Sequence, residues 1–234
     1  MWYIYKKELK TYFSTPFGFI FIGIFLLASG IVFTVYNLLG GNGDMTGMFS
    51  ILSNISVMVF PVLTMRSFAD ERRAGTDKLL RTSRLNDYQI VVGKYLAAFT
   101  VFLTAVCATG FYVFLLAQYG YPNYSSIMGS YIGFILLGAT FISICLFAAA
   151  LCETHVTAAI FSFGLLFFVV IAKSFGSNLQ IPVIKDIVNW IAITSKYDDF
   201  SRGILTLHSI VYYIGFSVFM VFISVKAEES QRYK

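Results

Sequence analysis

Long apolar runs alternate with short polar segments along the whole chain, and this pattern predicts an all-α protein that crosses a membrane. A transmembrane helix needs about 20 consecutive, mostly apolar residues. Six runs are close to or above that length, at residues 17–39, 45–65, 95–117, 127–151, 156–172 and 204–225. Polar turn residues at 118–123 separate the third run from the fourth. The pattern therefore predicts six transmembrane helices.

Composition agrees with this interpretation and excludes a water-soluble domain. The 234 residues are 58% hydrophobic and only 12% charged, about half the charged fraction of soluble proteins. The first run is longer than the apolar core of a signal peptide and has no convincing cleavage site after it, so we expect it to stay as a span. The three cysteines, an odd number, lie in or at the ends of predicted helices, which argues against a disulfide framework.

The basic residues predict the orientation, because Lys and Arg accumulate on the cytoplasmic side of membrane proteins. With both termini inside, 13 of the 17 Lys and Arg residues are cytoplasmic, and the other four lie in the segment 173–203. We expect a multi-pass protein of the plasma membrane, the cytoplasmic membrane in a bacterium. The net charge of +5 then reflects this topology and contact with anionic membrane lipids, without a nucleic-acid partner.

The chain is predicted to form one transmembrane domain, residues 1–234, with two accessory segments. Residues 1–16 are predicted to form an interfacial helix, because aromatic and apolar side chains share one arc of a helical wheel and three lysines share the next. The arc comprises Trp2, Tyr5, Leu9, Tyr12 and Phe13, and the lysines are Lys6, Lys7 and Lys10. The segment 173–203 is too apolar for a solvated loop, so we expect short helices at the outer side of the membrane.

The most informative polar segment is 66–94, which we call the elbow. It holds seven basic and four acidic residues, whereas the following 57 residues carry no formal charge. Gly75 separates two helical patterns, Thr76 is placed to cap a short helix, and Leu79 and Leu80 form a small apolar patch. A solvated loop that only fixes topology is one interpretation. Asn86, with Gln89 three residues on, resembles a capping box that opens the next helix. The two caps and the leucine pair favour a docking surface.

The residues of the elbow also resemble a known family. The run Phe-Ala-Asp-Glu-Arg-Arg-Ala-Gly-Thr at 68–76, followed by Leu79 and Leu80, resembles the signature of ABC-2-type transporter permeases. It is most similar to the branch that contains gliding-motility and nitrous-oxide-reductase-maturation permeases. Residues 6–16, 150–159 and 197–205 resemble further parts of the same family. The resemblance covers essentially the whole chain.

The resemblance implies an ABC-2-type permease fold and the permease half of an ABC transporter, an exporter. Two such chains, as a homodimer or with a second permease subunit, enclose the pathway, and a separate cytosolic ATPase binds ATP and Mg²⁺. The implied ATPase-docking residues are Glu71, Arg72, Arg73, Gly75, Thr76, Leu79 and Leu80, with Glu153 and His155 as a second cytoplasmic contact. The chain has no G-x-x-x-x-G-K-[ST] motif. We therefore predict a non-enzymatic subunit with no cofactor, catalytic residue or metal ligand of its own.

Two other functions fit parts of the pattern. A membrane scaffold regulated by an ATPase shares every feature above except transport. An ion-coupled secondary transporter normally carries ionisable groups in mid-membrane, and the predicted spans hold almost none. His208 lies near the outer end of the last span, where a surface position is favoured over a coupling role. Glu153 and His155, two residues apart, fit a turn or a partner contact better than a proton relay or metal site.

Overall fold

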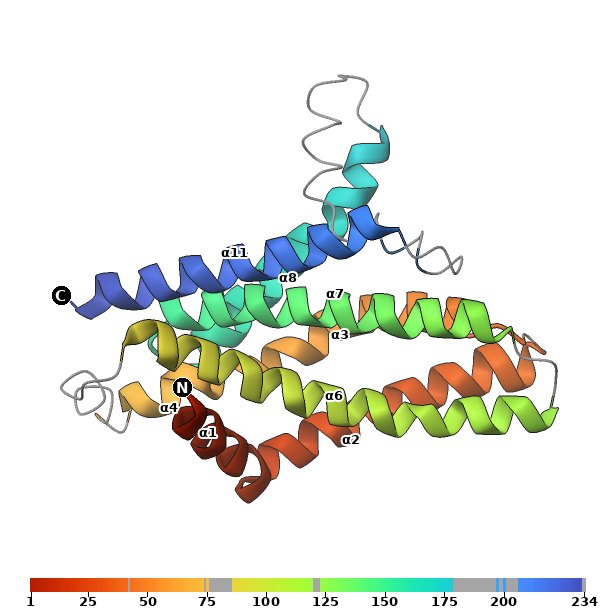
Figure 1. Ribbon diagram of the computed structural model, residues 1–234, viewed down its shortest axis with the longest axis horizontal. Coiled ribbons are helices and arrows are strands. Elements are labelled where there is room, and N and C mark those ends of the chain that lie inside the picture. Colours follow the sequence, from red (N-terminus) through yellow and green to blue (C-terminus); the bar gives the residue numbers. More distant parts are fainter. Residues whose placement is uncertain are drawn as a thin grey trace.

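The structure is a computed structural model that describes residues 1–41, 43–73, 75, 86–119, 123–178, 197, 200 and 206–232 (Figure 1). Helices form almost all of this part of the chain, and it contains no strand. They are α1 (Trp2–Ser14), α2 (Pro16–Phe33) with its π-helical extension η1 (Thr34–Leu39), α3 (Thr46–Thr64), α4 (Arg66–Arg73), α6 (Asp87–Tyr119), α7 (Tyr124–Leu151), α8 (His155–Asn178) and α11 (Leu207–Arg232).

Five segments of the described chain are long and apolar enough to cross a membrane. They are Pro16–Leu39, Thr46–Arg73, Asp87–Gln118, Tyr124–Leu151 and Leu207–Ser230. Each coincides with a predicted run, which confirms an all-α, multi-pass architecture. The remaining predicted span, 156–172, falls in α8, where the described apolar stretch is the shorter His155–Ile171. The count of six spans and the orientation stay predictions.

Helix α7 lies at the centre of the bundle and packs against α3, α6, α8 and α11 (Figure 1). Phenylalanine rings fill the space around it: Phe60 lies 5.1 Å from Phe102, and Phe49 lies 5.2 Å from Phe134, between ring centroids. Gly138 of α7 leaves room for the ring of Phe102, which a Cβ at that position would hit. Close packing of this kind, helped by small residues, is what holds helices together in lipid.

Helix α1 precedes the first span and lies against the bundle. Pro16 starts α2, and the extended backbone at Thr15 separates the two helices. Ile4 of α1 packs against Gly93 of α6, where a Cβ would lie only 2.9 Å from the Ile4 Cγ2 atom. Helix α1 is therefore fixed to α6 by a close contact.

The predicted aromatic arc of α1 divides between two environments. Trp2 and Phe13 are exposed, whereas Tyr12 is buried, and Tyr5 and Leu9 pack against the core. Tyr12 points into the bundle, where its hydroxyl donates a hydrogen bond to the Leu63 carbonyl. The interfacial position of α1 stays a prediction.

Candidate functional site

One end of the bundle brings together α1, α4, the start of α6, the end of α7, the start of α8 and the end of α11 (Figure 1). Charged side chains gather at this end. We call this group the helix-end cluster. It comprises Lys7, Glu8, Arg66, Asp70, Glu71, Arg72, Lys94, His155 and Glu228. Helix α4 supplies four of its members. The cluster therefore connects the first part of the elbow to the ends of five other helices.

Lys94 is the most deeply buried charge in the cluster. Its side chain is 0% exposed, and its ammonium donates hydrogen bonds to the Ser67 carbonyl and to Glu71. It also lies 4.5 Å from the centroid of the Phe68 ring. An unpaired buried ammonium is unstable in an apolar interior. Lys94 consequently requires Glu71 in place, which joins α6 to α4.

Glu71 also binds α1. Lys7 of α1 donates a hydrogen bond of 3.0 Å to the second Glu71 oxygen. Burial lowers the pKa of Lys7, but the hydrogen bond and the charge of Glu71 outweigh it, and the net effect raises the pKa above its ordinary value. Lys7 thus stays charged at neutral pH, and one carboxylate links α1, α4 and α6.

Arg72 joins α4 to the end of α7 and to α11. Its guanidinium donates to the carbonyls of Cys152 (2.6 Å) and Ala150 (2.7 Å) and to the Glu228 carboxylate (2.8 Å). The last carbonyls of a helix have no partner within that helix, and the planar, five-donor fork of arginine suits such a set of acceptors. Arg72 therefore caps the C-terminus of α7.

Asp70 completes the connections of α4. One oxygen pairs with Arg66 at 2.8 Å, and the other lies 3.1 Å from Nε2 of His155, the first residue of α8. The Arg66 guanidinium stacks on the ring of Phe17 in α2, 3.9 Å from its centroid. Six helices, namely α1, α2, α6, α7, α8 and α11, thus contact charged side chains of α4.

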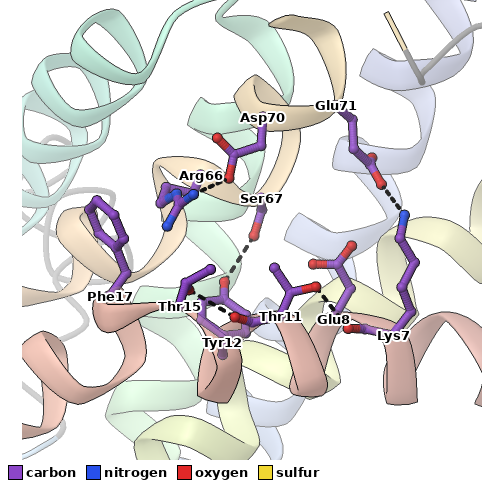
Figure 2. Close-up of a pocket in the computed structure, with 10 residues that line it drawn as sticks. All are labelled: Lys7, Glu8, Thr11, Tyr12, Thr15, Phe17, Arg66, Ser67, Asp70 and Glu71. Carbon is purple, nitrogen blue, oxygen red and sulfur yellow. Dashed lines mark hydrogen bonds and ion pairs between the residues drawn. The ribbon is translucent and has the colours of Figure 1, made fainter. Parts of the chain in front are cut away.

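Between α1 and α4 the cluster leaves a cavity of about 240 Å³, which Figure 2 shows with its lining side chains. Hydroxyl groups line it beside the charges: the Tyr12 hydroxyl lies 3.2 Å from the Ser67 hydroxyl. Glu8 also faces the cavity and is only 8% exposed. Burial raises the pKa of the Glu8 carboxyl, and Lys94, 3.9 Å away, offsets part of that rise.

The predicted docking residues fall into different environments. The side chains of Glu71 and Arg72 are mostly buried and are bonded within the chain, whereas Arg73 and Gly75 are exposed. Gly75 has φ +66°, a conformation that glycine adopts without strain. Thr76, Leu79 and Leu80 lie outside the described residues. The structure thus brings Glu71 and Arg72 together with His155, through α4, but leaves Glu153 exposed in the turn before α8.

Sequence reasoning missed several members of the cluster. The sequence pattern marks Lys94 only as the polar end of the elbow, and it indicates no role for Glu8 or Glu228. A signal for Lys94 exists: it stands two turns inside a helix that begins at Asp87, followed by a long uncharged run. A lysine at that depth needs an acidic partner. No sequence feature near Glu228 indicates its pairing with Arg72, which lies 156 residues away in the chain.

Comparison with known protein families identifies the family of this chain. The family described as ABC-2 family transporter protein matches residues 36–225, which is most of the chain. The chain belongs to this family. It is therefore a membrane permease subunit of an ABC transporter, the non-catalytic component, and a multi-pass membrane protein. ABC-2 permeases typically pair with an ATPase subunit. A search of curated proteins finds no match to the chain.

Proposed function

We propose that this ABC-2 permease is half of an exporter in the plasma membrane, driven by a cytosolic ATPase that docks on the elbow. A second permease chain, identical or paired, completes the pathway, and ATP and Mg²⁺ bind to the ATPase. The outward direction and the branch of gliding-motility and nitrous-oxide-reductase-maturation permeases rest on the sequence resemblance. The docking surface rests on the caps and the leucine pair of the elbow.

One structural observation supports the coupling role. Helix α4 is the start of the elbow, and its charged residues contact six other helices of the bundle. Coupling between distant sites is carried by packed side chains and by networks of hydrogen bonds and ion pairs. A displacement of the elbow by an ATPase therefore moves several helix ends together. In this proposal Glu71 and Arg72 hold the elbow in position, while Arg73 and the leucines contact the ATPase.

The decisive experiment changes the leucine pair. We expect Leu79→Asp or Leu80→Asp to abolish coupled transport and to weaken ATPase binding by about 2 kcal/mol or more, roughly 30-fold, because central apolar residues dominate interfaces. Leu39→Asp is the matched control, since Leu39 is 80% exposed at the opposite end of the bundle. Binding is measured by titration of the purified ATPase, and transport in vesicles that contain the complex.

The same experiment separates the alternatives. Binding of a cytosolic ATPase to the elbow requires that this end faces the cytoplasm, so it also tests the orientation. If both leucine variants bind the ATPase and transport normally, the elbow only determines topology. ATPase binding that depends on the leucines, without any transported substrate in the wild type, supports the scaffold function instead.

A further inference from the structure

The cavity between α1 and α4 has an uneven balance of charge. Its lining includes two cations and three carboxylates. Lys7 is paired with Glu71, and Arg66 is paired with Asp70. Glu8 remains: its ion-pair partner Lys94 lies outside the lining, at 3.9 Å, and hydrogen-bonds to Glu71 instead. Electrostatic complementarity therefore favours a cationic ligand over an anionic one, because an anion has to compete for cations that already hold partners.

The carboxylate of Glu8 is a hydrogen-bond acceptor that faces this cavity. Figure 2 shows its carboxylate directed between α1 and α4. The residue is more than nine-tenths buried, yet no hydrogen bond reaches its carboxylate from the part of the chain that the structure describes. Its nearest cation, Lys94, is 3.9 Å away and bonds to Glu71 and Ser67. A buried carboxylate in this state is stabilised by any ligand that supplies N–H donors and a positive charge.

The position of the cavity indicates where such a ligand comes from. Helix α1 exposes Trp2, Tyr3 and Phe13, and its exposed Lys6 stacks over Trp2, 5.6 Å from the ring centroid. Exposed aromatics and lysines on one short helix are typical of a helix at the membrane surface. The cavity lies between α1 and α4, so a position of α1 at the membrane surface brings it to the depth of the adjacent headgroups. Its 240 Å³ is below the 300–1,000 Å³ range of pockets that enclose whole small molecules, so it suits a headgroup.

We propose that this cavity binds the primary ammonium of an aminophospholipid headgroup, of the phosphatidylethanolamine type, with Glu8 as its ion-pair partner. A primary ammonium donates three N–H groups, which fill the acceptor positions of the Glu8 carboxylate. A quaternary choline ammonium has no N–H donor and cannot do this. The bound headgroup bridges α1 and α4, the interfacial helix and the start of the elbow. This site is independent of the proposed coupling to an ATPase.

The test uses the full chain in detergent and measures lipid binding by native mass spectrometry. Phosphatidylethanolamine, phosphatidylcholine and phosphatidylglycerol with the same acyl chains are added separately. We expect the wild type to bind phosphatidylethanolamine about tenfold more tightly than phosphatidylcholine, the factor for one charge-assisted hydrogen bond. Glu8→Gln should reduce the difference to about twofold or less, and Glu8→Asp should keep most of it. Glu229→Gln is the matched control, because Glu229 pairs with Lys226 outside the cavity.

Four results overturn the proposal. Equal binding of the ethanolamine and choline lipids removes the role of the N–H donors, and tightest binding of phosphatidylglycerol identifies an anion site at Lys7 and Arg66. Competition by soluble glycerophosphoethanolamine at the same concentration as the lipid indicates a free amine ligand. The melting temperature of Glu8→Gln distinguishes lost binding from lost folding. A Glu8→Gln variant that melts like the wild type and keeps the full lipid preference also refutes the site.

Discussion

Replacement of Arg72 by alanine tests whether the helix-end cluster stabilises the fold. Arg72 donates to two carbonyl groups at the C-terminus of α7 and to Glu228 of α11. Alanine removes all three bonds and leaves their acceptors in place. Arg73, the next residue, is exposed, so Arg73→Ala removes the same charge from the same helix without removing a contact within the described chain.

The magnitude follows from the burial of the pair. The side chains of Arg72 and Glu228 are each 11% exposed, so solvent screens their interaction little. Removal of one partner from a buried ion pair costs about 3–5 kcal/mol, because the other charge stays buried without compensation. The two carbonyls add to that cost where water cannot replace the arginine. For a chain of this size, 3–5 kcal/mol corresponds to a fall in melting temperature of about 6–20 °C.

The cysteines of the chain provide the assay. Cys145 is buried in α7, so a thiol-reactive fluorescent dye reports its exposure when the bundle unfolds on heating. The partly or fully exposed thiols, Cys107 and Cys152, are first replaced by serine to lower the background. Arg72→Ala should melt well below the parent, and Arg73→Ala should melt within about 2 °C of it, because surface substitutions usually change stability by less than 0.5 kcal/mol.

The variant Arg72→Lys tests the geometry of the guanidinium separately from its charge. Lysine keeps the charge for Glu228 but lacks the planar fork that reaches two carbonyls together. Arg72→Lys should therefore lose part of the stability, between the parent and Arg72→Ala. If Arg72→Ala melts like Arg73→Ala, the cluster does not hold the helix ends together, and its proposed role in coupling loses its basis.

Two further predictions concern α1. In lipid-free detergent, Glu8→Gln should match the wild type at pH about 4 and become the more stable of the two as pH rises. The reason is that burial raises the pKa of Glu8, so the wild type loses stability when this carboxyl ionises, whereas glutamine does not ionise. Thermal melts from pH 4 to 8 measure the difference, and a difference that does not change with pH contradicts the prediction. Gly93→Leu should displace α1, because Ile4 occupies the space that the new side chain needs. The displaced helix should be cleaved faster by trypsin at Lys10. Gly110→Leu is the control, since Gly110 borders open space, and it should leave the cleavage rate unchanged.

The helices could be predicted from the sequence because lipid imposes a simple requirement. A span must be apolar, about 20 residues long and helical, since its backbone can only bond to itself. The predicted run 127–151 accordingly coincides with α7, Tyr124–Leu151, at its C-terminal end. The predicted start of the third helix at Asn86 also agrees with α6, which begins at Asp87. The extension of the second span becomes a separate helix, α4, after a break at Met65.

The partners of the charged residues could not be predicted, because local pattern holds no information on tertiary pairs. Arg72 and Arg73 are adjacent and chemically identical, yet one is bonded to α7 and α11 while the other is exposed. Their directions differ because neighbouring side chains on a helix do not share a face. The choice between the two faces depends on where α7 ends, which the sequence of the elbow does not contain.

The number of charges in a polar segment between spans is therefore a poor measure of the surface that it offers to a partner. In the described part of the elbow, Glu71, Arg72 and Lys94 are bonded inside the chain. Such buried pairs cost desolvation and pack less favourably than apolar residues do, so their presence requires a reason other than stability. A network of discrete, directional bonds fixes the relative positions of helix ends, which apolar contacts allow to slide. That property suits the coupling role that we propose for this end of the permease.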